Sequence, residues 1–259
     1  MLHIDIPHVS APVGVRIGCA GWAIRREHSQ RFADVGTHLQ RYATLFNCVE
    51  INSCFYRAHR HSTYERWADS VPADFRFAVK LPKVITHERR LVGVGSELDQ
   101  FLAETSGLGI RRGPVLVQLP PSFAFDSPTA ESFFAELRGR FDGDVVLEPR
   151  HETWFTPAVD SLLNARRVAR VAADPPRVPV AAQPAGYDRI VYYRLHGSPR
   201  VYYSGYSNES LIEIARAVDE KASQGIATWC IFDNTALGAA TSDALAVSAI
   251  LSDCHRVTR

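Results

Sequence analysis

Ionisable and amide side chains stand at the ends of short apolar segments along most of this sequence. Three pairs are spaced two residues apart: Glu50 with Asn52, Glu148 with Arg150, and Arg194 with His196. Side chains two apart on an extended strand share a face, so the members of each pair point into the same space. Because such groups are costly to bury without partners, the pattern predicts that they gather at one polar site.

The predicted site combines acid–base candidates with groups suited to an anion. The candidate catalytic residues are Glu50, Lys80, Glu148, His196 and Asp233. The candidate substrate-binding residues are Asn52, Tyr56, His87, Gln118, Arg150, His151, Arg194 and Asn234. Two carboxylates on separate strands could act as general base and general acid if their pKa values differ, and an imidazole titrates near neutral pH. Guanidinium groups match a planar phosphate or carboxylate, whereas a lysine offers a point charge.

Two other interpretations of these residues stay open. The charged side chains could form structural ion pairs that close the end of the sheet. A divalent metal is a less favoured alternative, with possible ligands among Glu50, Glu148, His151, Asp174, His196 and Asp233. The sequence has no H-x-x-x-H or C-x-x-C unit, and the neighbouring cations would repel a metal, so no cofactor is predicted. Glycine-rich phosphate loops of the Walker or dinucleotide type are also absent from the sequence.

The elements that would position these residues alternate along the chain. Eight short apolar segments are expected to be strands: Val15–Cys19, Cys48–Asn52, Phe75–Lys80, Pro114–Leu119, Val145–Glu148, Val168–Ala173, Ile190–Leu195 and Thr228–Phe232. Most are nearly continuous hydrophobic runs, as in parallel strands covered on both faces. With helices between them, they predict an α/β fold, a single (β/α)₈ TIM barrel over residues 1–259, whose site lies at the carboxyl ends of the strands.

The helical pattern is clearest at Ser207–Gly225, where apolar residues repeat on one face ahead of a terminal glycine. Ser127 and Pro128 are expected to be the N-cap and the first-turn proline of a helix over Thr129–Arg140. The segment Asp174–Asp188 holds four prolines. We therefore expect an irregular connection after the sixth strand.

Composition limits the class of protein. Apolar residues make up 46% of the chain and the net charge is +1, so no strongly basic surface attracts nucleic acid overall. The five cysteines are odd in number and widely separated, which favours free thiols in the cytoplasm over a disulfide framework. No apolar stretch approaches the ~20 residues of a membrane span, and residues 1–14 lack the pattern of an export signal.

Seven ordered motifs make the chain resemble the domain of unknown function 72 family, also called YecE-like. They are IGCAGW at 17–22, VEINSCFYR at 49–57, FAVKLPKVITH at 77–87, LVQLPPSF at 116–123, LEPRHETWF at 147–155, YRLHG at 193–197 and FDN at 232–234. The resemblance implies a TIM barrel with a site at its strand ends, and it implies no settled activity. The family pattern has Thr at Cys54, Phe at Pro149 and Asn at Asp233, so here a carboxylate joins the site.

Two functions fit these observations. The first is an enzyme of the hydrolase or phosphodiesterase-like kind. It would act by acid–base or hydrolytic chemistry on a small anionic substrate such as a phosphorylated compound or a nucleic-acid fragment. The second is a non-catalytic module that binds an anionic metabolite or nucleic acid. Neutralisation of Glu50 and Glu148 by Arg150, Arg194 or Lys80 would favour the second. Exposed aromatic side chains at Tyr56 and in the loop 202–206 could stack on either ligand. The sequence predicts no membrane partner and leaves the oligomeric state open.

Overall fold

The computed structural model describes residues 14–257, in which strands and helices alternate. The absence of an export signal was predicted from a segment that lies, apart from Gly14, outside the described residues. The strands are β1 (Val15–Cys19), β2 (Cys48–Ile51), β3 (Arg76–Lys80), β4 (Arg112–Gln118), β5 (Val145–Glu148), β6 (Val168–Arg170), β7 (Ala172–Asp174), β8 (Ala185–Gly186), β9 (Ile190–Leu195) and β10 (Ala227–Phe232). The α-helices are α1 (His38–Tyr42), α2 (His61–Asp69), α3 (Gly95–Thr105), α4 (Ser127–Arg140), α5 (Pro157–Ala165), α6 (Asn208–Ser223) and α7 (Ala239–Val257).

The strands form two sheets, so the chain has a mixed α/β fold. One sheet has the order β1-β10-β9-β7 and the other the order β2-β3-β4-β5-β6-β8. Every pair of neighbouring strands is parallel except β6 with β8. A single bridge between Ala20 and Glu50 links the first sheet to the second. The closed eight-stranded barrel therefore stays a prediction, whereas the alternating parallel strands that it requires are present.

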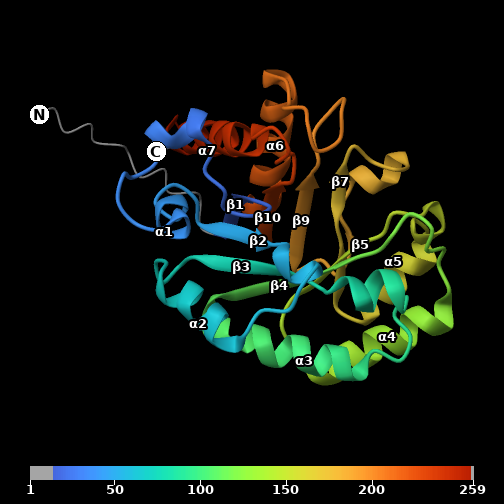
Figure 1. The fold of residues 1–259 in the computed structure, drawn as a ribbon. Coiled ribbons are helices and arrows are strands. Elements are labelled where there is room, and N and C mark those ends of the chain that lie inside the picture. The colour runs from blue at the N-terminus through green and yellow to red at the C-terminus, as the bar shows by residue number, and fades with distance from the viewer. Residues whose placement is uncertain (1–13, 258–259) are drawn as a thin grey trace, which may run out of the picture.

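Helices lie on the outer side of the strands (Figure 1). Helices α6 and α7 contact β10, α7 also contacts β1, and α5 contacts β6. Helix α6 lies within the predicted segment, with Ser207 as its N-cap, since the Ser207 hydroxyl accepts a hydrogen bond from the Ser210 amide, and Gly225 follows the helix with a φ of 77°. No helix within residues 14–257 combines the length and the apolar composition needed to cross a bilayer.

Three local predictions need correction. The expected sixth strand is split at Val171 into β6 in one sheet and β7 in the other. The N-cap of α4 is Asp126 and not Ser127, because the Asp126 carboxylate accepts the Thr129 amide at 3.0 Å from an extended backbone. The proline-rich connection after β7 is irregular as expected, but it also contains the short antiparallel strand β8 and a 3-10 turn at Pro179–Ala182.

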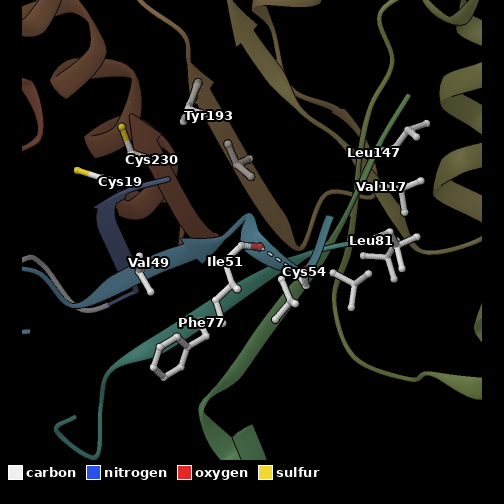
Figure 2. Packing of buried hydrophobic residues seen from close by; sticks show 14 of the residues in the cluster. Cys19, Val49, Ile51, Cys54, Phe77, Leu81, Val117, Leu147, Tyr193 and Cys230 are labelled. Atoms are coloured by element: carbon white, nitrogen blue, oxygen red, sulfur yellow. Dashed lines mark hydrogen bonds between the residues drawn. The ribbon is translucent and has the colours of Figure 1, made fainter. Parts of the chain in front are cut away.

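In most strands, alternate residues belong to two different apolar clusters. On β2, Val49 and Ile51 face the large cluster that the helices cover. Figure 2 shows Phe77 of β3 near them, and Val117 of β4 further along the cluster near Leu81 and Leu147. Cys48 belongs instead to a smaller buried cluster that takes residues from both sheets: Cys48, Ala78, Leu116, Val146, Ala169, Val171, Ile190, Tyr192, Trp229 and Ile231. We call the strand faces that meet in this smaller cluster the inner face.

Candidate functional site

Charged side chains continue the inner face at the carboxyl ends of the strands. On five strands the residue two positions beyond an inner-cluster residue is ionisable, which gives the series Cys48 to Glu50, Ala78 to Lys80, Val146 to Glu148, Tyr192 to Arg194 and Ile231 to Asp233. His196 follows Arg194 by two more positions. Strand alternation alone therefore carries these groups to one place, which we call the strand-end cluster: Glu50, Lys80, Glu148, Arg150, Arg194, His196 and Asp233.

Arg194 forms the centre of this cluster. Its Nε and Nη2 donate to the Glu50 carboxylate at 2.8 to 3.2 Å, and its Nη1 donates to Oε2 of Glu148 at 2.9 Å. Its Nη2 also lies 2.9 Å from Oδ2 of Asp233. Burial lowers the pKa of Arg194, but the three carboxylates outweigh burial and hold that pKa well above its usual value. One guanidinium thus ties together three strands from two sheets.

A second layer of contacts surrounds Glu148. Its Oε1 lies 2.6 Å from Nη2 of Arg150 and 2.9 Å from Nε2 of His196. The other ring nitrogen of His196 lies 3.0 Å from Oδ2 of Asp233, so two carboxylates hold the imidazole. Burial raises the pKa of Glu148 and of Asp233, but Arg194 and the other cationic neighbours lower both pKa values below the usual range. Both groups are therefore ionised at neutral pH.

Lys80 differs from the other charged members of the cluster because its ammonium has no hydrogen-bond acceptor within residues 14–257. Its Nζ lies 4.1 Å from the centre of the Phe55 ring, and the residue is only 9% exposed. Burial and the positive charge of Arg194 lower the pKa of Lys80 to about 8, although the nearby carboxylates oppose this. The thiol of Cys54, where the family pattern has Thr, donates to the Lys80 carbonyl at 3.0 Å and so ties the loop to this strand end.

Phe55 connects Lys80 to two further predicted site residues. The imidazole of His87 meets the Phe55 ring edge-on at 5.0 Å, and burial together with the charge of Lys80 lowers the pKa of His87. Tyr56 packs against the same ring and is 81% exposed. These residues extend the cluster from the buried strand ends to the surface.

The remaining predicted residues lie at the margin or serve local structure. Asn52 lines a cleft of about 350 Å³ with Trp22 and Ser53, and its buried Oδ1 has no partner among the described residues. The Gln118 amide donates to the Leu119 carbonyl.

Two predicted binding residues have other partners. His151 caps a 3-10 turn by accepting the Thr153 amide. Asn234 donates to the Ser204 carbonyl and to Asp243. Neither makes a hydrogen bond to the strand-end cluster, so we do not include them in it.

Sequence reasoning missed Tyr192, whose hydroxyl donates to Oε2 of Glu50 at 2.8 Å. Its position two residues before Arg194 was the available signal, because both must share the inner face. It was hidden because a tyrosine inside an apolar strand has the pattern of an ordinary core residue.

The metal alternative finds no arranged ligand set. Among the described residues, no group of three His, Cys, Asp or Glu side chains could hold a metal ion. The carboxylates of Glu50 and Glu148 that were considered as ligands are directed at Arg194.

Comparisons with known proteins agree on one family. The model for "Protein of unknown function DUF72" matches residues 16–258. The UPF0759 protein YecE of Escherichia coli is 31% identical over 67% of this chain, and YunF of Bacillus subtilis is 27% identical over 55%. These matches cover 59% and 53% of the relatives, so the chain spans little more than half of their length.

Solved structures of the same family share the fold. A protein from Enterococcus faecalis superposes with a TM-score of 0.77 at 20% identity, covering 92% of this chain and 95% of that one. A protein from Thermotoga maritima superposes with a TM-score of 0.75 at 23% identity, covering 92% and 98%. With the family model matching nearly every described residue, the chain belongs to the DUF72 family.

Proposed function

We propose that the strand-end cluster binds a small anionic substrate and that the protein is an enzyme acting on it by acid–base chemistry, with Lys80 as the group that meets the anion. The single observation that carries the proposal is the Lys80 side chain, which is only 9% exposed and whose ammonium has no acceptor within residues 14–257. An ammonium that has lost most of its hydration and has no acceptor is destabilised, and a bound anion would reduce that cost.

The other charges of the cluster support an anion over a cation. Each of the three carboxylates already accepts from Arg194 or lies in an ion pair with it. Arg150 faces Glu148 through Nη2, but its buried Nε has no partner among the described residues. Nζ of Lys80 and Nε of Arg150 therefore remain as donors without an acceptor among the described residues, which favours a phosphate or carboxylate ligand.

Lys80 is also the best candidate for proton transfer. The Glu148 carboxyl stays ionised because of its cationic neighbours, so it is a poor general acid at neutral pH. A lysine whose pKa lies near 8 can exchange a proton close to physiological pH. The acid–base role that the sequence suggested for the two glutamates is better assigned to Lys80, with the glutamates holding Arg194.

A non-catalytic anion-binding module is the second candidate. It is favoured by the neutralisation of Glu50 and Glu148 by Arg194, the arrangement that we associated with binding without chemistry. Both functions use Lys80 to hold the anion, and they differ in whether a bound ligand is converted.

Thermal unfolding with added ligand tests the proposal. Inorganic phosphate and small organic phosphates should raise the Tm of the wild-type protein and not that of Lys80→Met, because a ligand that binds only the native state stabilises it. Lys83→Met, which removes an exposed lysine paired with Glu88, is the matched control and should keep the shift. Turnover of a stabilising ligand separates enzyme from module, and an equal shift in wild type and Lys80→Met would overturn the assignment of Lys80.

Further proposals concern the frame of the site. We infer that the two sheets close into one eight-stranded barrel, supported by the Ala20–Glu50 bridge at one junction and by Val171, whose amide donates to the Leu147 carbonyl, at the other. We infer that this barrel is one domain. A cytoplasmic location is supported by four buried cysteines with free thiols, Cys19, Cys48, Cys54 and Cys230. An experimental structure and fractionation of cells test these inferences.

A further inference from the structure

Lys80 is an unusual cation for this chain. Only three of the 29 lysine and arginine residues are lysines, namely Lys80, Lys83 and Lys221. Arginine is permanently charged and forms bidentate hydrogen bonds with anions, so at a purely electrostatic site it would bind an anion at least as well as lysine does. What lysine adds is an amine that can lose its proton and act as a nucleophile.

The three lysines have contrasting surroundings. The side chain of Lys83 is 51% exposed and pairs with Glu88, and that of Lys221 is 28% exposed and pairs with Glu220. Lys80 has no ion pair within residues 14–257, lies against the Phe55 ring and is near the positive charge of Arg194. Burial and the neighbouring Arg194 both disfavour the charged form, which is how proteins activate a nucleophilic lysine, and they act against the attraction of the ammonium to the face of the Phe55 ring.

We infer that Lys80 forms a Schiff base with a carbonyl group of the anionic substrate, and this inference rests on the proposed function. The neutral Nζ attacks the carbonyl carbon to give a carbinolamine. Loss of one water molecule breaks the C–O bond and leaves a C=N bond, and uptake of one proton makes it an iminium. Addition of water reverses these steps, so no oxidant or reductant is required. The substrate class is therefore an anionic aldehyde or ketone.

The low pKa of Lys80 gives this step an expected magnitude. At pH 7.5 an amine with a pKa of about 8 is neutral to an extent roughly 200 times that of a lysine with the usual value of 10.5. Limited access to a buried amine reduces this advantage. We expect Lys80 to react about tenfold faster than Lys83 and Lys221.

Reductive trapping with a matched pair of aldehydes tests the inference. The wild-type protein is treated at pH 7.5 with pyridoxal 5′-phosphate or with uncharged pyridoxal, reduced with borohydride and mapped by peptide mass spectrometry. We expect label mainly on Lys80, more with the phosphorylated aldehyde, and less when inorganic phosphate competes. Lys80→Arg should lose this label while Lys83 and Lys221 react as before.

The two aldehydes separate the inference from the proposed function. Labelling of Lys80 no faster than that of Lys83 and Lys221 overturns the Schiff base, even if phosphate raises the Tm. Fast labelling of Lys80 by both aldehydes alike supports the nucleophile but contradicts an anionic substrate. Thermal unfolding of Lys80→Arg establishes that a loss of label does not come from a loss of fold.

Discussion

The inner face of the sheets has two halves of opposite chemistry on the same strands. Towards the amino ends, Cys48, Ala78, Leu116 and Val146 form a dry apolar layer. Two residues further along, the same faces carry Glu50, Lys80, Gln118 and Glu148, all of them buried. Strand geometry treats both halves alike, because the side chains alternate in the same way throughout.

The difference between these halves shows what the fold requires and what it only tolerates. An apolar layer can fill the space between two sheets, as it does in the half towards the amino ends of the strands. Replacing a buried ion-pair network by apolar residues of similar volume is often neutral or stabilising. The charged half is therefore not needed to hold the strands together, and its position at the strand ends favours a function.

The largest expected effect is that of Arg194→Met. This variant leaves Glu50, Glu148 and Asp233 without their shared cation, and an uncompensated buried charge costs about 3–5 kcal/mol. Urea unfolding at pH 7 measures the loss of stability. The deficit should shrink in acid, because Glu148 and Asp233, whose pKa values Arg194 helps to lower, take up protons more readily once Arg194 is gone.

Arg170→Met is the matched control for Arg194→Met. Arg170 is equally buried, but it pairs with a single carboxylate, Asp160, whose side chain is 27% exposed. Water can solvate that carboxylate once its partner is gone. A loss as large as that for Arg194→Met would mean that burial of arginine matters and that the shared network does not.

Next in size is Leu116→Ala in the apolar half. Leu116 is fully buried in the inner cluster, and truncation should cost about 2–4 kcal/mol through lost burial and a cavity. Phosphate should still raise the Tm of this variant by as much as that of the wild type. If phosphate no longer raised the Tm of this variant, the apolar half would also be needed for anion binding. The two halves would then not have separate roles.

The strands could be predicted from sequence because both sheets are parallel and covered. Seven of the eight predicted segments coincide with one strand each, to within two residues at either end. The sixth predicted strand is divided because the chain passes from one sheet to the other at Val171. This crossing depends on pairing with strands that are distant in sequence. The predicted N-cap of α4 was wrong by one residue, because Asp126 and Ser127 are adjacent and both residue types are good N-caps.

The candidate site was predictable as a set of residues but not as a set of partners. Period-2 spacing selected Glu50, Glu148, Arg194 and His196, and hydrogen bonds join these four side chains. Spacing could not reveal that Arg194 forms ion pairs with three carboxylates, because these contacts depend on where strands from two sheets meet. It also could not separate the unpaired Lys80 from the paired charges around it.

Lys80→Met is expected to raise the free energy of unfolding, whereas Arg194→Met and Leu116→Ala lower it. The affected group is the Lys80 ammonium of the wild type. Its pKa is lowered from 10.5 to about 8, so the protonated native form is disfavoured by about 3 kcal/mol relative to the unfolded chain. Removing the charge should therefore stabilise the protein at pH 7 by about 1–3 kcal/mol, since the lowered pKa already includes the attraction of the nearby carboxylates. Differential scanning calorimetry of both proteins measures the gain.

The pH dependence of this gain has a definite sign. Between about pH 8 and 10.5 the unfolded wild type binds a proton at Lys80 that the folded form has lost, so wild-type stability rises relative to Lys80→Met. The advantage of the variant should shrink across that window and be constant below it. A constant difference from pH 7 to 10.5 would mean that Lys80 has an ordinary pKa.

The smallest expected effect on stability is that of Tyr56→Ala. Tyr56 is 81% exposed and makes a T-shaped contact with Phe55, so the free energy of unfolding should change by no more than about 0.5 kcal/mol. If the charged half extends along Phe55 to the surface, the variant should bind an aromatic phosphate several-fold more weakly and inorganic phosphate equally well, because only the former can stack. Titration calorimetry with both ligands compares them. Equal weakening would instead mean that Tyr56 holds Phe55 against Lys80, and no weakening would confine the charged half to the buried strand ends.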